Sequence, residues 1–458
     1  MKRRAKEKLN KNIHKFKQDD NYILLDINSG AVHVIDEMIF DIMDTFNGSN
    51  DSEVINSLKN RYDSKELEEA IGELHELINT GYLFAPNIDV PPTFAETGIV
   101  KSLCLMVAQD CNLRCKYCFG DGGSYGGQRA VMSEEIGKRA VDFIIEHSKN
   151  RRHCEIDFFG GEPLINFNTV KAVTEYVRKR ETETDKIFKL TLTTNGILLN
   201  DDKIQWLNDN NISLVLSLDG RKEIHDAMRP DSTGHGSYDK ALKNFLKLVK
   251  SRNGDNYYLR GTYTKNNLDF TNDVLDLNDK GFDILSVEPV VLKESPLGFT
   301  ETDLSRINEE YNKLTEAYLK RHNEGRGFFF FHFNMDLSNG PCVAKRLSGC
   351  GAGHEYFAVD VNGDLYPCHQ FVGRNKYKLG NVFGGVNDPQ NWSEYFRQSH
   401  VLNKPKCREC WARFFCSGGC HANADLFHDD IREPYEIGCE IQKKRLECAI
   451  YVQAMINS

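Results

Sequence analysis

The pattern of apolar and polar positions divides the chain into three parts. In the first part, to about residue 95, alternating segments at Tyr22–Ile27 and Ala31–Asp36 flank an Asn28-Ser29-Gly30 turn and predict a hairpin. Apolar residues then recur with helical spacing at Glu37–Phe46, Asp51–Arg61 and Ser64–Thr80. A closing strand is predicted at Thr80–Pro86. A small sheet with three helices is typical of a winged-helix-like α+β domain.

In the second part, strands and helices alternate. The strands are predicted at Leu103–Gln109, Cys154–Gly160, Lys189–Asn195, Ser213–Asp219, Tyr257–Thr264 and Ile284–Val291. The helices between them are predicted at Ser133–Lys149, Asn168–Glu183, Asp201–Asn210, Tyr238–Ser251 and Leu268–Lys280. Six βα units in series predict an α/β fold with a parallel sheet and right-handed crossovers. Because the pattern contains no seventh or eighth unit, we expect an open, partial (β/α)6 barrel.

The third part is rich in cysteine and glycine and has little periodicity. We expect it to have a meagre apolar core and to need a metal to fold. The predicted domains are therefore 1–95, 96–300 and 341–458, with a helical bridge at 301–340.

Composition narrows the function. The net charge of -9 argues against nucleic acid as the main partner. No apolar run approaches the roughly 18 residues of a membrane span, and Gly327–Phe333 predicts a short buried strand. The basic start lacks the apolar run of a signal peptide. We therefore expect a cytoplasmic, reducing environment, in which the 14 cysteines indicate metal binding or catalysis rather than disulfides.

Polar motifs follow four of the predicted strands, where the chemistry of such a sheet gathers. They begin at Gln109, Gly160, Thr194 and Ser217. The first leads into three cysteines with C-x3-C-x2-C spacing, Cys111, Cys115 and Cys118. Three thiolates this close can hold three corners of a 4Fe–4S cluster and leave one iron open, whereas a structural zinc site needs four ligands.

The triad, followed by Gly-Gly-Glu-Pro at the next strand end, resembles the radical S-adenosylmethionine (SAM) enzymes. There the open iron is chelated by SAM, and one electron yields a 5′-deoxyadenosyl radical. Two glycines allow close approach of the backbone, a glutamate suits an ammonium, and an arginine suits a carboxylate. The resemblance implies SAM contacts from Tyr117, Gly160, Gly161, Glu162, Asn195, Ser217, Asp219, Arg229 and Glu288. The alternatives are local: a turn cap at Asp219, an ion pair at Arg229, and backbone contacts at Asn195 and Glu288.

The C-terminal cysteines resemble the SPASM extension, which carries auxiliary clusters. The resemblance implies one closed 4Fe–4S cluster on Cys407, Cys410, Cys416 and Cys439, and a second on Cys350, Cys368 and Cys420. Cys342 is a candidate fourth ligand of the second cluster, and the alternative is an open iron that takes a substrate thiolate. With the triad this makes three 4Fe–4S clusters, although a pair of zinc sites suits some of the spacings.

The three resemblances together are typical of maturases of ribosomally made peptides. Residues 14–43 and 342–371 resemble most the maturases of SCIFF peptides, which join a cysteine sulfur to a carbon as a thioether. The resemblance implies a cysteine-rich precursor peptide, held by its leader on the N-terminal domain, and an external one-electron donor of the flavodoxin or ferredoxin type. We keep two alternatives: a radical SAM enzyme that makes formylglycine, as sulfatase maturases do, and a non-catalytic, metal-stabilised scaffold that binds a peptide.

Overall fold

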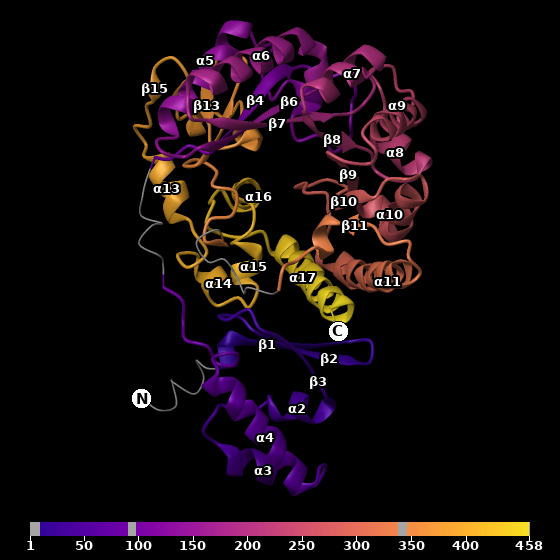
Figure 1. Cartoon of the computed structure of the whole chain (residues 1–458), viewed down its shortest axis with the longest axis vertical. Coiled ribbons are helices and arrows are strands. Elements are labelled where there is room, and N and C mark those ends of the chain that lie inside the picture. Colours follow the sequence, from indigo (N-terminus) through magenta and orange to yellow (C-terminus); the bar gives the residue numbers. More distant parts are fainter. Residues whose placement is uncertain (1–9, 90–97, 338–345, 458) are drawn as a thin grey trace.

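The computed structural model describes residues 10–89, 98–337 and 346–457. In Figure 1 the N-terminal unit lies at one end and the sheet of the barrel at the other, with the cysteine-rich tail between them. The C-terminal helix α17 (Glu436–Ile456) lies where these three parts meet.

The N-terminal unit is a three-stranded antiparallel sheet with three helices, as the winged-helix-like pattern predicts. Its sheet has the order β1 (Ile13–Gln18), β2 (Asn21–Asp26), β3 (Val32–Ile35). The helices that follow are α2 (Glu37–Ile42), α3 (Asp51–Leu58) and α4 (Ser64–Asn79). The prediction missed β1, whose alternation is weak, and the closing strand is wrong because residues 80–84 form turns.

A buried carboxylate shapes the predicted β2–β3 turn. The Oδ1 atom of Asp26 accepts hydrogen bonds from the amides of Asn28 (3.1 Å) and Ser29 (2.8 Å). Its Oδ2 accepts from the Ala85 amide (3.1 Å), so the turn is tied to the chain after α4. Gly30 completes the turn with a φ of 76°, a backbone region that favours glycine.

The second part is an open, partial barrel, which confirms the predicted fold class. Its strands pair in parallel, in the order β11-β10-β9-β8-β7-β6-β4. The strands are β4 (Ser102–Gln109), β6 (His153–Gly160), β7 (Ile187–Thr194), β8 (Ser213–Ser217), β9 (Tyr257–Tyr263), β10 (Ile284–Pro289) and β11 (Phe329–Phe330). The helices of this part are α5 (Glu134–His147), α6 (Phe167–Glu183), α7 (Asp201–Asp209), α8 (Lys222–Met228), α9 (Tyr238–Ser251), α10 (Phe270–Asp279) and α11 (Leu304–Asn323).

The tail extends the sheet of the barrel, which the sequence did not predict. Its strand β12 (Tyr356–Val359) pairs in parallel with β4, and β13 (Asp364–Tyr366), β14 (Gly380–Asn381) and β15 (Gly385–Val386) continue outward. The short helices of the tail are α13 (Trp392–Gln398), α14 (Pro405–Arg408), α15 (Arg413–Cys416) and α16 (His421–His428). Cys368 therefore follows a strand that belongs to the same sheet as the cysteine loop.

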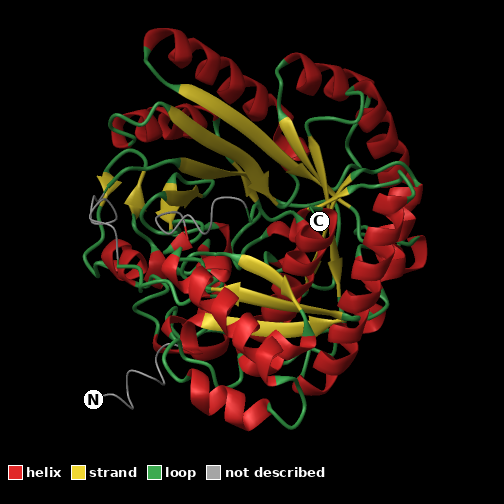
Figure 2. Cartoon of the chain, turned by 60° about the horizontal axis from the view of Figure 1, so that its bottom comes forward, coloured by secondary structure: helices red, strands yellow, loops and turns green. Residues whose placement is uncertain are grey.

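The tail also has a larger apolar core than expected. Phe371, Tyr377 and Phe396 are almost fully buried in a cluster that includes Met106 of β4. The 21-residue helix α17 packs on α11 and on the segment after β11. Figure 2 shows helices, in red, around the outside of the barrel strands, in yellow. Its apolar residues alternate between two different cores, which removes the simple helical period from the sequence.

Two remaining expectations concern apolar segments. Only Phe329 and Phe330 of Gly327–Phe333 pair as a strand, and a 3-10 helix follows at Phe331–Phe333, so the predicted strand is too long. Phe331 is 53% exposed rather than buried. None of the helices in the described ranges has the length and apolar character needed to span a bilayer.

Candidate functional site

The cysteine loop leaves the C-terminal end of β4 and runs beside the segment that follows α8. The Arg114 amide donates to the Pro230 carbonyl (2.8 Å) and the Lys116 amide to the Met228 carbonyl (2.9 Å). These bonds hold the backbone between the first and last cysteine of the triad. The loop is therefore fixed by the same segment that carries Arg229.

The two glycines of Gly-Gly-Glu-Pro pack β6 against the cysteine loop. A Cβ on Gly160 would lie 2.2 Å from the Ala108 carbonyl oxygen, and one on Gly161 would lie 2.2 Å from that of Asp110. The Gly160 carbonyl accepts a hydrogen bond from the Tyr125 hydroxyl (2.9 Å). These glycines are required for close packing of two strand ends, a role that the sequence interpretation did not include.

Glu162 joins the ends of β6 and β7. Its fully buried carboxylate accepts hydrogen bonds from the Leu164 amide (3.0 Å), the Thr194 hydroxyl (2.9 Å) and the Asn195 amide (2.8 Å). Burial raises the pKa of Glu162 to about 7, although the three hydrogen bonds act to lower it. A carboxylate has about four lone-pair sites, so one remains for the ammonium that the sequence predicts.

The donor set fits an iron–sulfur cluster. Burial raises the pKa of Cys111 to about 12, with further contributions from the charges of Glu162 and of the Cys115 and Cys118 thiols. Thiols with such pKa values become thiolates only when a metal binds them. Beside Cys111, the buried Nδ2 of Asn112 has no hydrogen-bond partner among the described residues, which indicates room for a bound group there.

Arg229 is held in place by a carboxylate at the end of β8. Its Nε and Nη2 donate to the two oxygens of Asp219, both at 3.0 Å. Asp219 is fully buried and also accepts from the Tyr117 hydroxyl and the Thr262 amide. Burial would raise the pKa of Asp219, but the Arg229 guanidinium holds it below its usual value. On its other side Arg229 donates to the Cys115 thiol, so only its remaining N–H groups can meet a SAM carboxylate.

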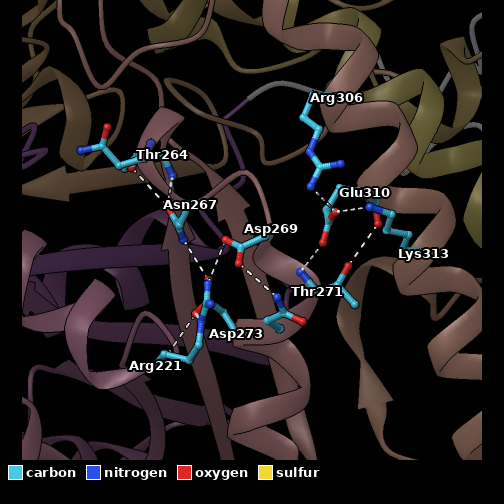
Figure 3. Close-up of polar contacts among 11 residues, drawn as sticks. Arg221, Thr264, Asn267, Asp269, Thr271, Asp273, Arg306, Glu310 and Lys313 are labelled. Atoms are coloured by element: carbon cyan, nitrogen blue, oxygen red, sulfur yellow. Dashed lines mark hydrogen bonds and ion pairs between the residues drawn. The ribbon is translucent and has the colours of Figure 1, made fainter.

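The residues that follow Asp219 in the same loop after β8 are also held in place by close contacts and ion pairs. Ser217 is half-buried at the strand end, and the loop then turns so that a Cβ on Gly220 would lie 2.3 Å from the Asp273 Cβ. Arg221 donates from Nε to Asp273 (2.7 Å) and from Nη2 to Asp269 (2.9 Å). Figure 3 shows these contacts, to which Asn267 and Thr264 also belong. It also shows a neighbouring group in which Glu310 of α11 contacts Thr271, Arg306 and Lys313.

Glu288, predicted to contact SAM, belongs to a second buried ion pair. It lies at the end of β10 and accepts from Nη1 of Arg445, on α17 (3.0 Å). His332 lies 3.3 Å from its other oxygen. Burial would raise the pKa of Glu288, but His332 and Arg445 lower it to about 2. The sequence interpretation missed Arg445 and His332, because no motif connects them with a strand end more than 40 residues away.

The tail cysteines gather in the two sets that the sequence predicts. Burial raises the pKa of Cys439 to about 12, and the thiols of Cys416, Cys407 and Cys410 contribute. Burial likewise raises the pKa of Cys368, with contributions from Cys420 and Cys350. Cys342 lies outside the described residues. Cys104, Cys154 and Cys448 are buried in the core, as expected for the first two.

Within the described ranges, no three histidine, cysteine or acidic side chains are arranged to hold a single metal ion. Ligands of a 4Fe–4S cluster bind different irons, so their sulfur atoms need not converge on one point. Every described cysteine is a free thiol.

Comparison with known proteins agrees with this geometry. Residues 105–273 match the radical SAM superfamily, and residues 350–411 match the SPASM iron-sulfur cluster-binding domain. The chain is 27% identical over 354 residues to a cysteine-type anaerobic sulfatase-maturating enzyme of Clostridium novyi, covering 71% of this chain and 90% of that enzyme. It is 22% identical over 474 residues to the radical SAM cyclopropyl synthase TigE of Paramaledivibacter caminithermalis, covering 95% and 94%.

A solved structure has a similar fold. The structure of native anSMEcpe with bound AdoMet matches with a TM-score of 0.64 and 22% identity, over 78% of this chain and 99% of that one. The domains present bind SAM and 4Fe–4S clusters. The chain therefore contains a radical SAM domain followed by a SPASM domain.

Proposed function

We propose that this chain is a radical SAM enzyme that forms thioether crosslinks in a cysteine-rich, ribosomally made precursor peptide. The observation that carries the proposal is the position of α17. Near its start α17 holds Cys439, predicted to bind an auxiliary cluster, and six residues later Arg445 reaches Glu288 in the barrel. Farther along, Tyr451 accepts from Asn21 of the N-terminal sheet (3.1 Å). One helix thus contacts all three parts that a peptide maturase needs.

The N-terminal sheet offers an edge for a leader peptide. β3 is an edge strand, so one side of its backbone is open to pairing with an extended peptide. Val34 of β3 is 51% exposed and Tyr82 is 56% exposed. His33, the neighbour of Val34 on β3, lies 3.3 Å from the Tyr82 carbonyl, so the backbone at Tyr82 lies beside this strand. Exposed apolar side chains near an open strand edge suit a leader with apolar residues.

The comparisons support a peptide substrate. The match to TigE extends over 95% of this chain, whereas the match to the sulfatase-maturating enzyme extends over 71% although it covers 90% of that enzyme. This chain therefore has about a quarter of its length beyond what it shares with the latter. SuiB bound to precursor peptide SuiA is similar over 93% of this chain, with 18% identity and a TM-score of 0.50.

In the proposed reaction the bound cluster and SAM supply a 5′-deoxyadenosyl radical. The peptide gives up one hydrogen atom from an acceptor carbon and one proton from a cysteine thiol, and a C–S bond forms. One electron is left over, and we propose the auxiliary clusters as its acceptor, in a chain with three 4Fe–4S clusters. The residues of this chain orient the cofactor: Glu162 and Arg229 through the contacts left open to them, and Ser217 at the end of β8.

The competing proposal is oxidation of a cysteine or serine side chain to formylglycine. The higher identity to sulfatase-maturating enzymes favours it. It gives an aldehyde and needs no leader, whereas the thioether reaction gives a C–S bond and no aldehyde.

The test uses full-length protein with reconstituted clusters, SAM, dithionite and a cysteine-rich precursor peptide that includes its leader. We expect 5′-deoxyadenosine and a loss of two hydrogens per crosslink, with one fewer thiol that iodoacetamide can alkylate. An aldehyde that reacts with a hydrazide, with the other thiols unchanged, would establish the formylglycine reaction instead. Replacing Val34 by lysine should weaken peptide binding but leave SAM cleavage without peptide unchanged.

A further inference from the structure

A fully buried lysine lies in the tail among neutral partners. Lys404, directly before α14, is 0% exposed. Its Nζ donates to the Gly418 carbonyl (3.0 Å) and lies 3.4 Å from Nδ1 of His421. An imidazole carries no negative charge, so His421 offers the ammonium no counter-charge. The ammonium is thus solvated by one carbonyl and one imidazole.

No carboxylate in the described part of the chain forms an ion pair with Lys404. Asp430 is within electrostatic reach of Lys404, but its Oδ1 already accepts from the Tyr395 hydroxyl (2.8 Å) and the Arg432 amide (2.9 Å). An ammonium buried without a counter-charge is strongly destabilising, and proteins avoid it unless an anion binds nearby. The position therefore indicates a negative group that is present in the working protein.

The groups around Lys404 identify that anion. Gly418 lies between Cys416 and Cys420, and a Cβ on this glycine would be 3.6 Å from the lysine Nζ. Lys404 interacts electrostatically with Cys407, Cys416 and Cys439, and also with Cys420. The first three belong to one predicted cluster and Cys420 belongs to the other. The lysine is thus placed between two sets of thiols that become thiolates when iron binds.

We propose that Lys404 is the shared counter-charge of the two tail clusters. A 4Fe–4S cluster with thiolate ligands is an anion, and reduction adds another negative charge. A fixed ammonium stabilises the reduced form more than the oxidised form and so raises the reduction potential. One lysine between two clusters also lessens their mutual repulsion. The inference rests on the SPASM domain and is independent of which bond the enzyme makes in its substrate.

The experiment compares Lys404→Met with Lys406→Met in the full-length protein with reconstituted clusters. Methionine keeps the volume of the buried chain but removes the charge, while Lys406 is two residues away, 53% exposed and paired with Glu433 and Glu436. Potentials are measured by redox titration followed by EPR, and the radical SAM cluster is recognised because its signal changes when SAM is added. We expect Lys404→Met to shift the potentials of both tail clusters to more negative values and Lys406→Met to leave them unchanged.

Two further measurements apply if the Lys404→Met variant incorporates its clusters poorly. Without metal, Lys404→Met should resist urea better than the parent chain, because the uncompensated charge is gone. Lys404→Arg, which keeps the charge, should load clusters normally even if Lys404→Met does not. Unchanged potentials in fully loaded Lys404→Met would overturn the proposal, as would equal loading defects in the arginine and methionine variants.

Discussion

Each of the two cysteine-rich regions contains a buried cation beside its thiols, but the cations differ in their partners. In the barrel, Arg229 lies beside Cys115 and is neutralised by the two oxygens of Asp219. In the tail, Lys404 lies among the thiols, and its close partners in the described part of the chain are a carbonyl and an imidazole. In the barrel the charge of Arg229 is balanced by a protein carboxylate, whereas in the tail the charge of Lys404 is balanced only when the clusters bind.

The backbone elements that carry the thiols also differ between the barrel and the tail. The cysteine loop is held by strands β4, β6 and β8, whose outward side chains form the main apolar core. The tail thiols lie on the short helices α14 and α15, on loops and on the first turn of α17. Because metal binding is coupled to folding where the protein core is small, the tail should depend on its clusters more than the barrel does.

Removal of the metal should therefore have the largest effect, and it should destabilise the tail more than the barrel. After anaerobic chelation, we expect amide hydrogens of residues 400–420 to exchange much faster, because the charge of Lys404 is then uncompensated. Amides of β6, β7 and β8 should remain protected. Hydrogen exchange with mass spectrometry measures both regions in one sample, and equal loss of protection in barrel and tail would show that the contrast is wrong.

The ion pair between Glu288 and Arg445 tests how the two regions are joined. Arg445→Met leaves a carboxylate that is only 24% exposed without its main partner, and we expect a loss of about 2 kcal/mol in the free energy of unfolding. The double variant with Glu288→Gln should recover most of this loss, and Lys443→Met, on the same helix but paired with Glu440, is the control. Urea unfolding of the protein with clusters measures the effect; equal losses in the single and double variants would exclude a specific pair.

A pH-dependent effect of similar size should come from the barrel. Burial raises the pKa of Asp157, on β6, from 3.8 to about 6, with Glu155 adding to the shift and Lys189 opposing it. Between these two pKa values the folded state binds the proton and the unfolded state does not, so the free energy of unfolding falls as pH rises. Asp157 should contribute a fall of about 2 kcal/mol from pH 4 to 6, and Asp157→Asn should remove this contribution while the exposed Glu155→Gln retains it. Glu162, whose pKa burial raises to about 7, adds a fall of the same sign that Asp157→Asn leaves in place. Chemical denaturation across this range measures the slope, and a slope in Asp157→Asn equal to that of the parent chain contradicts the assignment.

The barrel could be predicted from the sequence because its signals are local. Each strand is a short apolar run and each polar motif directly follows one, so Asp219 and Arg229 lie within one βα unit. The polar motifs lie at the ends of their strands, as the sequence predicts, while their contacts with SAM stay a prediction. The sequence could not indicate that Nε and Nη2 of Arg229 both donate to Asp219, because this depends on the orientation of the two side chains.

The tail and α17 were harder to predict because their contacts are distant in the chain. The pairing of β12 with β4 joins residues some 250 positions apart, and Arg445 meets Glu288 across 157 positions. Two apolar faces on α17, one for the barrel and one for the N-terminal sheet, leave no single helical stripe. Lys404 had a signal, a lysine three residues before the first cysteine of a cluster, but its burial could not be inferred.

The central claim is that the barrel starts the radical and the tail determines the bond that forms, and Cys350→Ala tests it most directly. This variant removes a predicted ligand of the tail without touching the cysteine loop, and Cys154→Ala, a buried cysteine outside all three sets, is the control. With SAM, dithionite and the cysteine-rich peptide, we expect Cys350→Ala to form 5′-deoxyadenosine while the peptide keeps its mass. A peptide that still loses two hydrogens per crosslink would contradict the account.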